Sequence, residues 1–369
     1  MTAGRIDFDG GGEFYTDLKA RVRAQLAQPG RERRAHQRMY VKTATLVAWA
    51  AISWILLVFA ATTWWQAAIL CVSLGLALAG IGFSVTHDAN HGSYSSSRNV
   101  NKTMRWSLDL MGASSYVWRI KHNVVHHTYT NIDGADSDIE QLPLARLAPD
   151  QKRWWFHRYQ HVYIWPLYGL FSVKWHTVGD LGLMIRGRVG MTPLHWPRGR
   201  ELFGLIAGKA VFLAWTIAIP VLVHPVWQVA VAFLATSFVL AFTIAIVFQL
   251  AHCLEEADFP TMDDLSKGGR TEWARHQVET TVNFAPRNRF LAWYLGGLNF
   301  QIEHHLFSRV CHIHYPDIAP VVREVCAEYG VNYQSHTTVW SAVASHARWL
   351  KRMGAKSDPA RRMAVTPTA

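Results

Sequence analysis

Residues 66–91 read QAAILCVSLGLALAGIGFSVTHDANH, an apolar run that ends in two histidines four positions apart. No charged residue occurs between Gln66 and Ser84. About 20 apolar residues are enough for a helix to cross the roughly 30 Å hydrocarbon core of a bilayer. The i, i+4 spacing puts His87 and His91 one turn apart on one helix face. This stretch therefore predicts a membrane-spanning helix that carries two imidazoles at its end.

Three more blocks of the chain are similarly apolar, so we expect four spans, at about residues 44–63, 66–84, 202–223 and 226–250. The third block reaches spanning length only if it includes Lys209, whose long side chain can extend toward the near interface. The alternative for each block is a buried helix of a water-soluble protein, but such helices are seldom so long and free of charge. The sequence predicts an all-α, polytopic membrane protein with its four transmembrane helices in two hairpins.

The basic residues indicate which side of the membrane each segment occupies. Residues 1–42 carry nine Lys and Arg residues, whereas the connections at 62–66 and 224–225 carry none. Lys and Arg accumulate in cytosolic loops. We therefore expect both termini and the long middle segment, 85–200, to be cytosolic. The expected organisation is an N-terminal cytosolic segment at 1–42, one integral membrane domain at 43–353 and a disordered tail at 354–369.

The net charge of +11 does not indicate a nucleic-acid partner. The basic residues are spread over the expected cytosolic segments, where anionic lipid headgroups account for them. The four cysteines show no CxxC spacing and no secreted context. We therefore expect them to be reduced, unpaired thiols.

Eight histidines fall into three clusters and one single site, each at or just beyond the expected cytosolic end of an apolar segment. They are His87, His91, His122, His126, His127, His252, His304 and His305. In an α-helix His122 and His126 share a face, and His127 lies about 100° around the axis. So many imidazoles exceed what one ion accepts. Without cysteine ligands they favour two first-row metal ions, with iron as the expected redox metal.

Several other side chains are expected to orient these imidazoles or to lie outside the site. Asp88, Asn123, Asp136, Glu255 and Glu303 are placed to accept hydrogen bonds from the outer N–H groups of the rings, although each can equally be a solvated cytosolic residue. His157 and His161 repeat the i, i+4 spacing without a third histidine beside them, so we expect no metal there. The same holds for His312 and His314. The remaining histidines, expected on the surface or in structural roles, are His36, His176, His195, His224, His276, His336 and His346.

The clusters HDANH (87–91), HNVVHH (122–127) and QIEHHLF (301–307) resemble the three histidine boxes of membrane fatty-acid desaturases. Gln301, at the head of the third box, resembles specifically the front-end, linoleoyl-CoA desaturase-like branch, where other desaturases have histidine. The similarity covers about residues 40–335. It implies that the eight histidines above are ligands of a di-iron centre held by a cytosolic helical cap, and that Gln301 occupies the position of a further ligand. Ser308, where the family often has proline, affects a turn and no ligand.

The resemblance also implies a reaction. An O₂-dependent enzyme of this kind removes two hydrogens from adjacent methylenes of an acyl chain, as acyl-CoA or acyl lipid, and leaves a cis double bond. Unactivated C–H bonds require a metal-borne oxidant, because side-chain acids and bases cannot supply one. Many front-end members carry a fused cytochrome b5 with a His-Pro-Gly-Gly motif, which does not occur here. We therefore expect a separate ferredoxin or cytochrome b5, with its reductase, to deliver electrons to a basic cytosolic surface.

Three other functions compete with this interpretation. A related di-iron membrane hydroxylase or ketolase would use the same oxidant but add oxygen to its substrate. A bis-histidine haem electron carrier would pair histidines on opposing helices near the bilayer interior, whereas every cluster here lies at a cytosolic end. A zinc-dependent membrane hydrolase would need fewer imidazoles.

Overall fold

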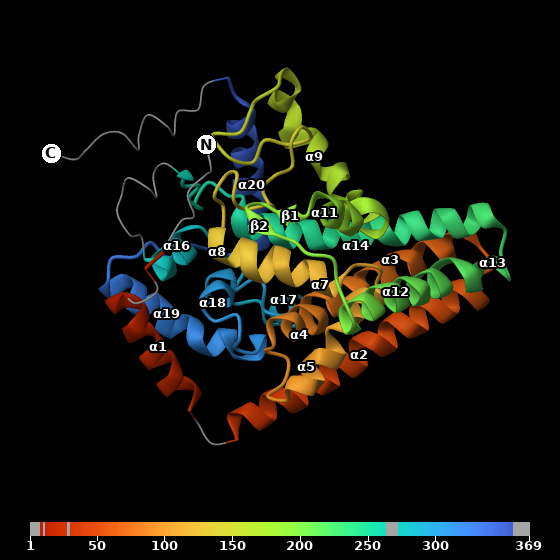
Figure 1. The fold of residues 1–369 in the computed structure, drawn as a ribbon, viewed down its shortest axis with the longest axis horizontal. Helices are drawn as coiled ribbons and strands as arrows, with labels where there is room; N and C mark the ends of the chain where they lie inside the picture. The colour runs from red at the N-terminus through yellow and green to blue at the C-terminus, as the bar shows by residue number, and fades with distance from the viewer. Residues whose placement is uncertain (1–7, 10–11, 28–29, 263–271, 357–369) are drawn as a thin grey trace.

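Four long helices extend together to one side of the molecule (Figure 1). This computed structural model describes residues 8–9, 12–27, 30–262 and 272–356. By length and composition, the segments able to cross a membrane are Ala35–Phe59, Trp64–His91, Arg200–Val221 and Val226–His252. They are built from α2 (Arg31–Phe59), α3 (Trp64–Ile81), α12 (Arg200–Leu213) and α14 (Val226–His252), with short continuations. Among the described residues, four helices are thus long and apolar enough to span a membrane, as many as the sequence predicts.

The bounds of the spans differ from the prediction in two places. The first begins at Ala35 and not near residue 44, because α2 continues through Arg38 and Lys42 without a break. The second runs beyond residue 84, through the π-helical segment η1 (Gly82–Thr86) into α4 (His87–His91). The ammonium of Lys209, which was expected to extend toward the near interface, donates to the backbone carbonyls of Gly112 and His176.

The central helix of this layer is α3, which packs against both α2 and α14. A Cβ atom at Gly75 would lie 2.7 Å from Cβ of Val239 and 2.9 Å from the carbonyl oxygen of Thr236. Glycine at this position lets α3 and α14 approach closely, as small residues do between membrane helices. On its other side, Ser73 lies 2.8 Å from both Trp49 Nε1 and Ser53 Oγ of α2. These contacts fix the α3 axis that carries the first histidine cluster.

The third span also contains a π-helical segment. This span consists of α12, the π-helical segment η5 (Ala214–Ala218) and α13 (Ile219–Val221). A short turn at residues 222–225 then leads into α14, which runs without a break to His252.

Shorter helices gather at the end of the four-helix layer that carries the histidines (Figure 1). They are α1 (Glu13–Leu26), α5 (Arg98–Met104), α6 (Trp106–Leu110), α7 (Ser115–Trp118), η2 (Arg119–His126), α8 (His127–Tyr129), η3 (Trp155–Tyr159), α9 (Gln160–Tyr168), α10 (Phe171–Lys174), η4 (Trp175–Gly179), α11 (Asp180–Arg186), α16 (Trp273–Glu279), α17 (Arg289–Tyr294), α18 (Gln301–Leu306), η6 (His312–His314), α19 (Tyr315–Glu328) and α20 (Val339–Gly354). The packing of these short helices places α18 beside the histidine-bearing ends of the second and fourth spans.

The all-α prediction misses four two-residue strands. β1 (Arg188–Val189) pairs antiparallel with β2 (Thr192–Pro193), and β3 (Asn283–Phe284) pairs parallel with β4 (Ser335–His336). Strands this short leave no alternation of apolar and polar residues to read in the sequence. The second ladder joins the chain before α18 to the chain before α20.

The N-terminal segment forms the helix α1, which lies against α19. It places Phe14, Leu18 and Val22 on one buried face, at i, i+4 and i+8. Arg21 forms an ion pair of 2.6 Å with Glu328 of α19. The next helix, α2, starts separately after Gly30, whose φ is 72°. Most of the expected C-terminal tail, residues 357–369, lies outside the described residues.

Candidate metal centre

The first histidine cluster ends the second span. His87 and His91 lie on α4, with ring centroids 4.7 Å apart, and both side chains are buried. The helix stops at Gly92, whose φ of 79° is the left-handed conformation that glycine adopts without strain. The i, i+4 pair therefore presents both rings to the same interior space.

The second cluster lies on a π-helix, and this changes its geometry. Three imidazoles occur on η2 and the start of α8, and the Nε2 atoms of His122 and His127 are only 3.3 Å apart. The expectation that His127 lies 100° away from His122 is wrong. In a π-helix residue i+5 stacks over residue i, so His127 turns back over His122. The ring of Trp118 stacks on His122 at 4.3 Å and closes that side.

The third cluster and the single site complete the group. His304 and His305 lie on α18, and His252 is the last residue of α14. The His304 ring is 4.5 Å from the His87 ring, and the His305 ring is 4.9 Å from the His252 ring. All four elements thus bring their histidines to one buried place.

The imidazole nitrogens fall into sets that match metal coordination. His87, His91, His122 and His304 offer ligand atoms within 4.8 Å of one another, and so do His126, His252 and His305. His127 forms a third such group with His304 and His305. It therefore lies between the other two sets.

Seven of the eight histidines also leave a buried ring nitrogen without a hydrogen-bond partner. These atoms are Nδ1 of His87, His127 and His252, and Nε2 of His91, His126, His304 and His305. Leaving a buried polar atom unpaired costs about 1–3 kcal/mol. Coordination to metal would satisfy six of these nitrogens, while the Asp88 carboxylate lies beside the seventh, Nδ1 of His87. Imidazole suits iron, zinc and copper. The residues present therefore fit a metal centre.

Burial favours the neutral, metal-binding form of several of these rings. Burial, with a contribution from neighbouring imidazoles, holds the pKa of His122, His127, His304 and His305 well below its usual range. His126 is different. Burial alone would lower its pKa, but the Asp136 and Asp138 carboxylates outweigh that effect and raise it. A carboxylate beside the outer nitrogen of a ligand ring raises the basicity of that ring.

Three side chains contact the outer Nδ1 atoms of imidazoles in the cluster and orient these rings. Asp136 Oδ2 lies 2.9 Å from Nδ1 of His126, as the sequence led us to expect for Asp136. Gln277 Oε1 lies 2.7 Å from Nδ1 of His305, and the Tyr315 hydroxyl lies 3.3 Å from Nδ1 of His304. Sequence reasoning missed Gln277 and Tyr315. Gln277 has no motif around it, whereas Tyr315 follows the third box closely in the sequence.

The other expected outer residues have different partners. Glu303 accepts from Asn283 and from the Tyr333 hydroxyl, both at 2.8 Å. Asn123 donates to the carbonyl oxygen of Asn90, at 2.9 Å. Glu255 forms ion pairs with arginines, Arg348 and Arg352. Three of the predicted contacts to imidazoles are thus replaced by contacts within the surrounding frame.

Asp88 and Gln301 do lie beside the histidines. An Asp88 oxygen is 3.7 Å from Nδ1 of His87, which is longer than a hydrogen bond. The side-chain nitrogen of Gln301 is 2.9 Å from Nε2 of His252.

The i, i+4 pair at His157 and His161 takes no part in the cluster. His157 is fully buried, with Nε2 at 2.8 Å from the carbonyl oxygen of Pro143 and Nδ1 accepting from the Trp154 amide. His312 lies between Lys42 and Asp88. Both ring nitrogens of His157 and of His312 are thus engaged.

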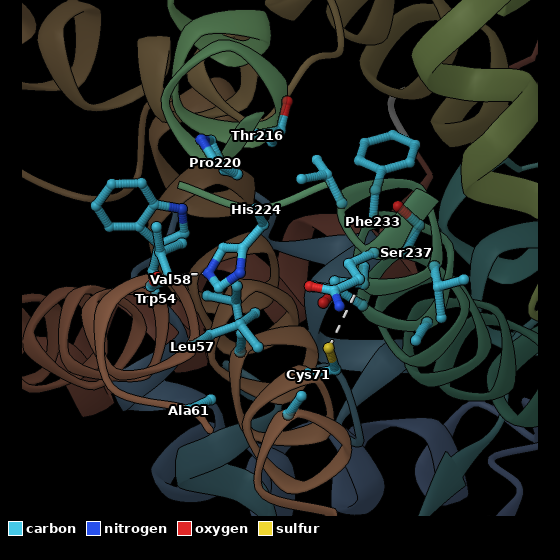
Figure 2. A pocket seen from close by; sticks show the side chains of 18 of the residues that line it. Trp54, Leu57, Val58, Ala61, Cys71, Thr216, Pro220, His224, Phe233 and Ser237 are labelled. Carbon is cyan, nitrogen blue, oxygen red and sulfur yellow. Dashed lines mark hydrogen bonds between the residues drawn. The ribbon is translucent and has the colours of Figure 1, made fainter. Parts of the chain in front are cut away.

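A cavity of about 620 Å³ lies between the four spanning helices. Figure 2 shows it with Trp54 and Leu57 of α2 on one side and Phe233 and Ser237 of α14 on the other. It follows α3 from Trp64 as far as Leu78. Leu78 precedes His87 by nine residues, or about 13 Å along a helix. Most of its lining is apolar.

Fold and site together define a helical protein with four candidate membrane spans among its described residues, two of which end in a shared cluster of histidines. The sequence model of the family described as "Fatty acid desaturase" matches residues 62–337, and the chain belongs to this family of oxidoreductases. The three histidine motifs, at residues 87–91, 122–127 and 301–307, all lie within the matched range.

Individual relatives agree with this assignment. The chain is 38% identical over 355 residues to an "sn-1 linoleoyl-lipid 6-desaturase" of Arthrospira platensis, with 95% of each chain covered. It is 36% identical to a protein of the same name from Synechocystis sp., over 97% of this chain and all of the relative. An "Acyl-lipid (8-3)-desaturase" of Physcomitrium patens is 35% identical, over 93% of this chain and 72% of its own.

Proposed function

We propose that the protein is an O₂-dependent fatty acyl desaturase that inserts a cis double bond into an acyl chain through a histidine-ligated di-iron centre. The convergence of seven partnerless, buried imidazole nitrogens in adjoining groups carries this proposal. Two iron ions, when bound, activate O₂ and supply the oxidant that unactivated methylenes require. The residues that would hold them are His87, His91, His122, His126, His127, His252, His304 and His305.

The polypeptide has three tasks around that centre. Its rings bind as neutral imidazoles, and Asp136 and Gln277 fix the orientation of His126 and His305 through their outer nitrogens. The Trp118 ring and the short helices enclose the site. Enclosure keeps water from reacting with the oxidant.

We propose front-end regiochemistry on a lipid-linked chain, that is, a new double bond on the carboxyl side of an existing one. Gln301 in the third box and the two relatives named as sn-1 linoleoyl-lipid 6-desaturases support this choice. The cavity suits the methyl end of the substrate, because its wall is mostly apolar and its inner end, at Leu78, lies on the helix that leads to the first box. Acyl-CoA remains the alternative headgroup.

The proposed topology has two membrane hairpins with both termini, residues 85–200 and the helical cap in the cytosol. Two features support it. The turns at the far ends of the spans carry no Lys or Arg, and exposed tryptophans lie beside them, namely Trp64, Trp65 and Trp227. Tryptophan is enriched where helices leave the bilayer. Within this organisation residues 43–353 form the desaturase domain, residues 1–42 precede it and residues 354–369 follow as a tail.

Electrons are proposed to come from a separate acidic ferredoxin or cytochrome b5 with its reductase. The net charge of +11 supports electrostatic docking of such a donor. Turnover with a ferredoxin should therefore fall as ionic strength rises, and a rate independent of salt would contradict this part of the proposal.

The experiment that tests the function is expression in a host that is supplied with defined fatty acids. Methyl esters are prepared from each lipid class and sn position and analysed by gas chromatography–mass spectrometry. A desaturase yields a product lighter by two hydrogens, and its double bond is located by derivatisation. A product heavier by one oxygen would instead identify the hydroxylase alternative.

Site variants connect that activity to the histidines. His127→Ala and His305→Ala should abolish the product while the protein still inserts into the membrane. His161→Ala is the matched control, because it belongs to a pair with the same spacing outside the cluster and should leave the product in place. Activity retained in either of the first two variants would overturn the ligand assignment.

A further inference from the structure

A buried lysine on α2 faces the first histidine box. The side chain of Lys42 is only 3% exposed. Its Nζ atom lies 2.9 Å from Nε2 of His312 and 5.4 Å from the centre of the Trp293 ring. A buried ammonium needs a compensating charge or acceptor. His312 supplies the acceptor, and the Trp293 ring adds a favourable cation–π contact.

His312 connects this lysine to a buried carboxylate. Its Nδ1 atom lies 2.8 Å from Oδ2 of Asp88, and its backbone N–H donates to the same oxygen at 3.3 Å. An ammonium can only donate and a carboxylate can only accept. The His312 ring therefore carries its proton on Nδ1 and accepts from Lys42 on Nε2. Burial favours this neutral ring, since it lowers the pKa of His312 despite the nearby Asp88.

Asp88 also lies beside a candidate metal ligand, the neighbouring residue His87. The other carboxylate oxygen of Asp88 lies 3.7 Å from Nδ1 of His87, a buried atom without a hydrogen-bond partner. A carboxylate at the outer nitrogen of a ligand histidine fixes the tautomer and the orientation of its ring. Asp88 is in turn held by His312 from one side of the cluster. Lys42, His312, Asp88 and His87 thus form a continuous buried array.

We propose that Lys42 and His312 are positioning residues for the first box: they hold the Asp88 carboxylate beside His87 and so set the direction in which that imidazole binds metal. This inference rests on the proposed di-iron function. Donor atoms of Asp88, Cys311 and His312 also lie close enough to hold an ion. That use is disfavoured, because both ring nitrogens of His312 are already engaged and the Lys42 ammonium would repel a cation.

The test compares three variants of the full-length protein, purified in detergent and loaded with iron. Lys42→Met removes the charge but keeps the approximate volume. We expect kcat to fall about 10–100-fold, as for other residues that orient a ligand, with KM unchanged because none of the four residues lines the substrate cavity. The Mössbauer quadrupole splitting of the bound iron should change. Lys42→Arg keeps the charge and should recover much of the lost kcat.

A double variant separates positioning from simple charge balance. Lys42→Met combined with Asp88→Asn leaves no unpaired buried charge, so this protein is expected to fold even if Lys42→Met alone does not. The array predicts that the double variant keeps the reduced kcat and the altered iron spectrum. Recovery of both to wild-type values would overturn the proposal and leave Lys42 a merely structural role.

Two matched controls address non-specific effects. Lys209→Met removes another largely buried lysine, whose ammonium binds the carbonyl oxygens of Gly112 and His176. His157→Gln replaces another buried histidine. Neither residue touches the array, so both should keep the wild-type iron spectrum. Absence of iron from the wild-type protein would refute the proposed function. A wild-type iron spectrum that is unchanged in Lys42→Met and the double variant would refute the array alone.

Discussion

The side-chain amide nitrogen of Gln301 lies 2.9 Å from Nε2 of His252. Gln301 begins α18, and His252 ends α14, so the head of the third box meets the single histidine at the end of the fourth span. An amide nitrogen can only donate, and the His252 ring therefore accepts this hydrogen bond. The other ring nitrogen, Nδ1, is buried without a hydrogen-bond partner and is left available to an ion, so Gln301 can orient the His252 ring from its outer side.

Replacing Gln301 with alanine should lower turnover more than it lowers metal content. The variant keeps all eight imidazoles but loses the group that orients His252, and such losses typically cost about 10–100-fold in activity or metal affinity. Iron per protein and product formation are measured on the same preparation, beside His252→Ala, which should lose more iron. Gln334→Ala is the control, because Gln334 bonds only to Asn332 through its amide. Wild-type turnover in Gln301→Ala would contradict this role.

Gln277 should prove necessary for the third box although no motif marks it. Its Oε1 accepts from His305 at 2.7 Å and from the Thr130 hydroxyl at 3.0 Å. In Gln277→Leu His305 loses its 2.7 Å hydrogen bond to this buried acceptor, whereas the Thr130 hydroxyl keeps the His126 carbonyl, so we expect turnover to fall about 10–100-fold. Gln277→Glu keeps an acceptor oxygen and should retain more activity. Equal loss in both variants would indicate that shape, and not the hydrogen bond, is what His305 requires.

Enlarging Cys71 should shift the preferred chain length toward shorter substrates. Cys71 lines the cavity from α3, and phenylalanine there would occupy space proposed for the methyl end (Figure 2). Two methylenes at roughly 0.8 kcal/mol each correspond to a change of about tenfold. The C18 to C16 product ratio, measured in a competition assay, should fall by about that factor. Ile69→Phe on the same helix is the control, because Ile69 is 60% exposed on the outer surface. An unchanged ratio in Cys71→Phe would place the acyl chain elsewhere.

Acid should weaken the fold through Glu256, outside the spans. Burial would raise the pKa of Glu256, but hydrogen bonds from His336 and Ser345 outweigh it and lower the pKa to about 2. Because the folded value lies below the unfolded one, this stabilisation is present above the unfolded pKa and is lost as pH falls toward the folded pKa. The melting-temperature difference between wild type and Glu256→Gln should therefore shrink between about pH 5 and pH 3. A constant difference would rule out this linkage.

The spans and the first box were predictable because they depend on local sequence. Charge-free blocks and the i, i+4 pair at His87 and His91 translate directly into a helix and one of its faces. Glu303 is a residue for which the local sequence predicts the wrong contact. It precedes His304 by one residue, or about 100° around α18, and it contacts Asn283 and Tyr333 while His304 and His305 face the cluster. The sequence shows the neighbours of each residue along the chain but not the partner segment that α18 meets.

Contacts between distant segments account for the rest. Gln277 reaches His305 from α16, and Lys42 reaches His312 from α2, across 270 residues of chain. Their side chains carry no periodic signal, so only the packed fold reveals them. The π-helical turn at η2 was also hidden, because one extra residue per turn leaves the same histidine spacing in the sequence.

The π-helical segment η1 has a consequence for how the sequence of the second span can change. It lies between α3, the part of the second span that packs against α2 and α14, and His87. Deleting one residue there would shorten the helix by only about 1.5 Å but would rotate everything beyond it by about 100°. The span would still cross the bilayer, while both imidazoles of the first box would aim away from His122 and His304. The extra residue thus works as an angular offset that sets the direction of the metal site independently of the surface presented to lipid.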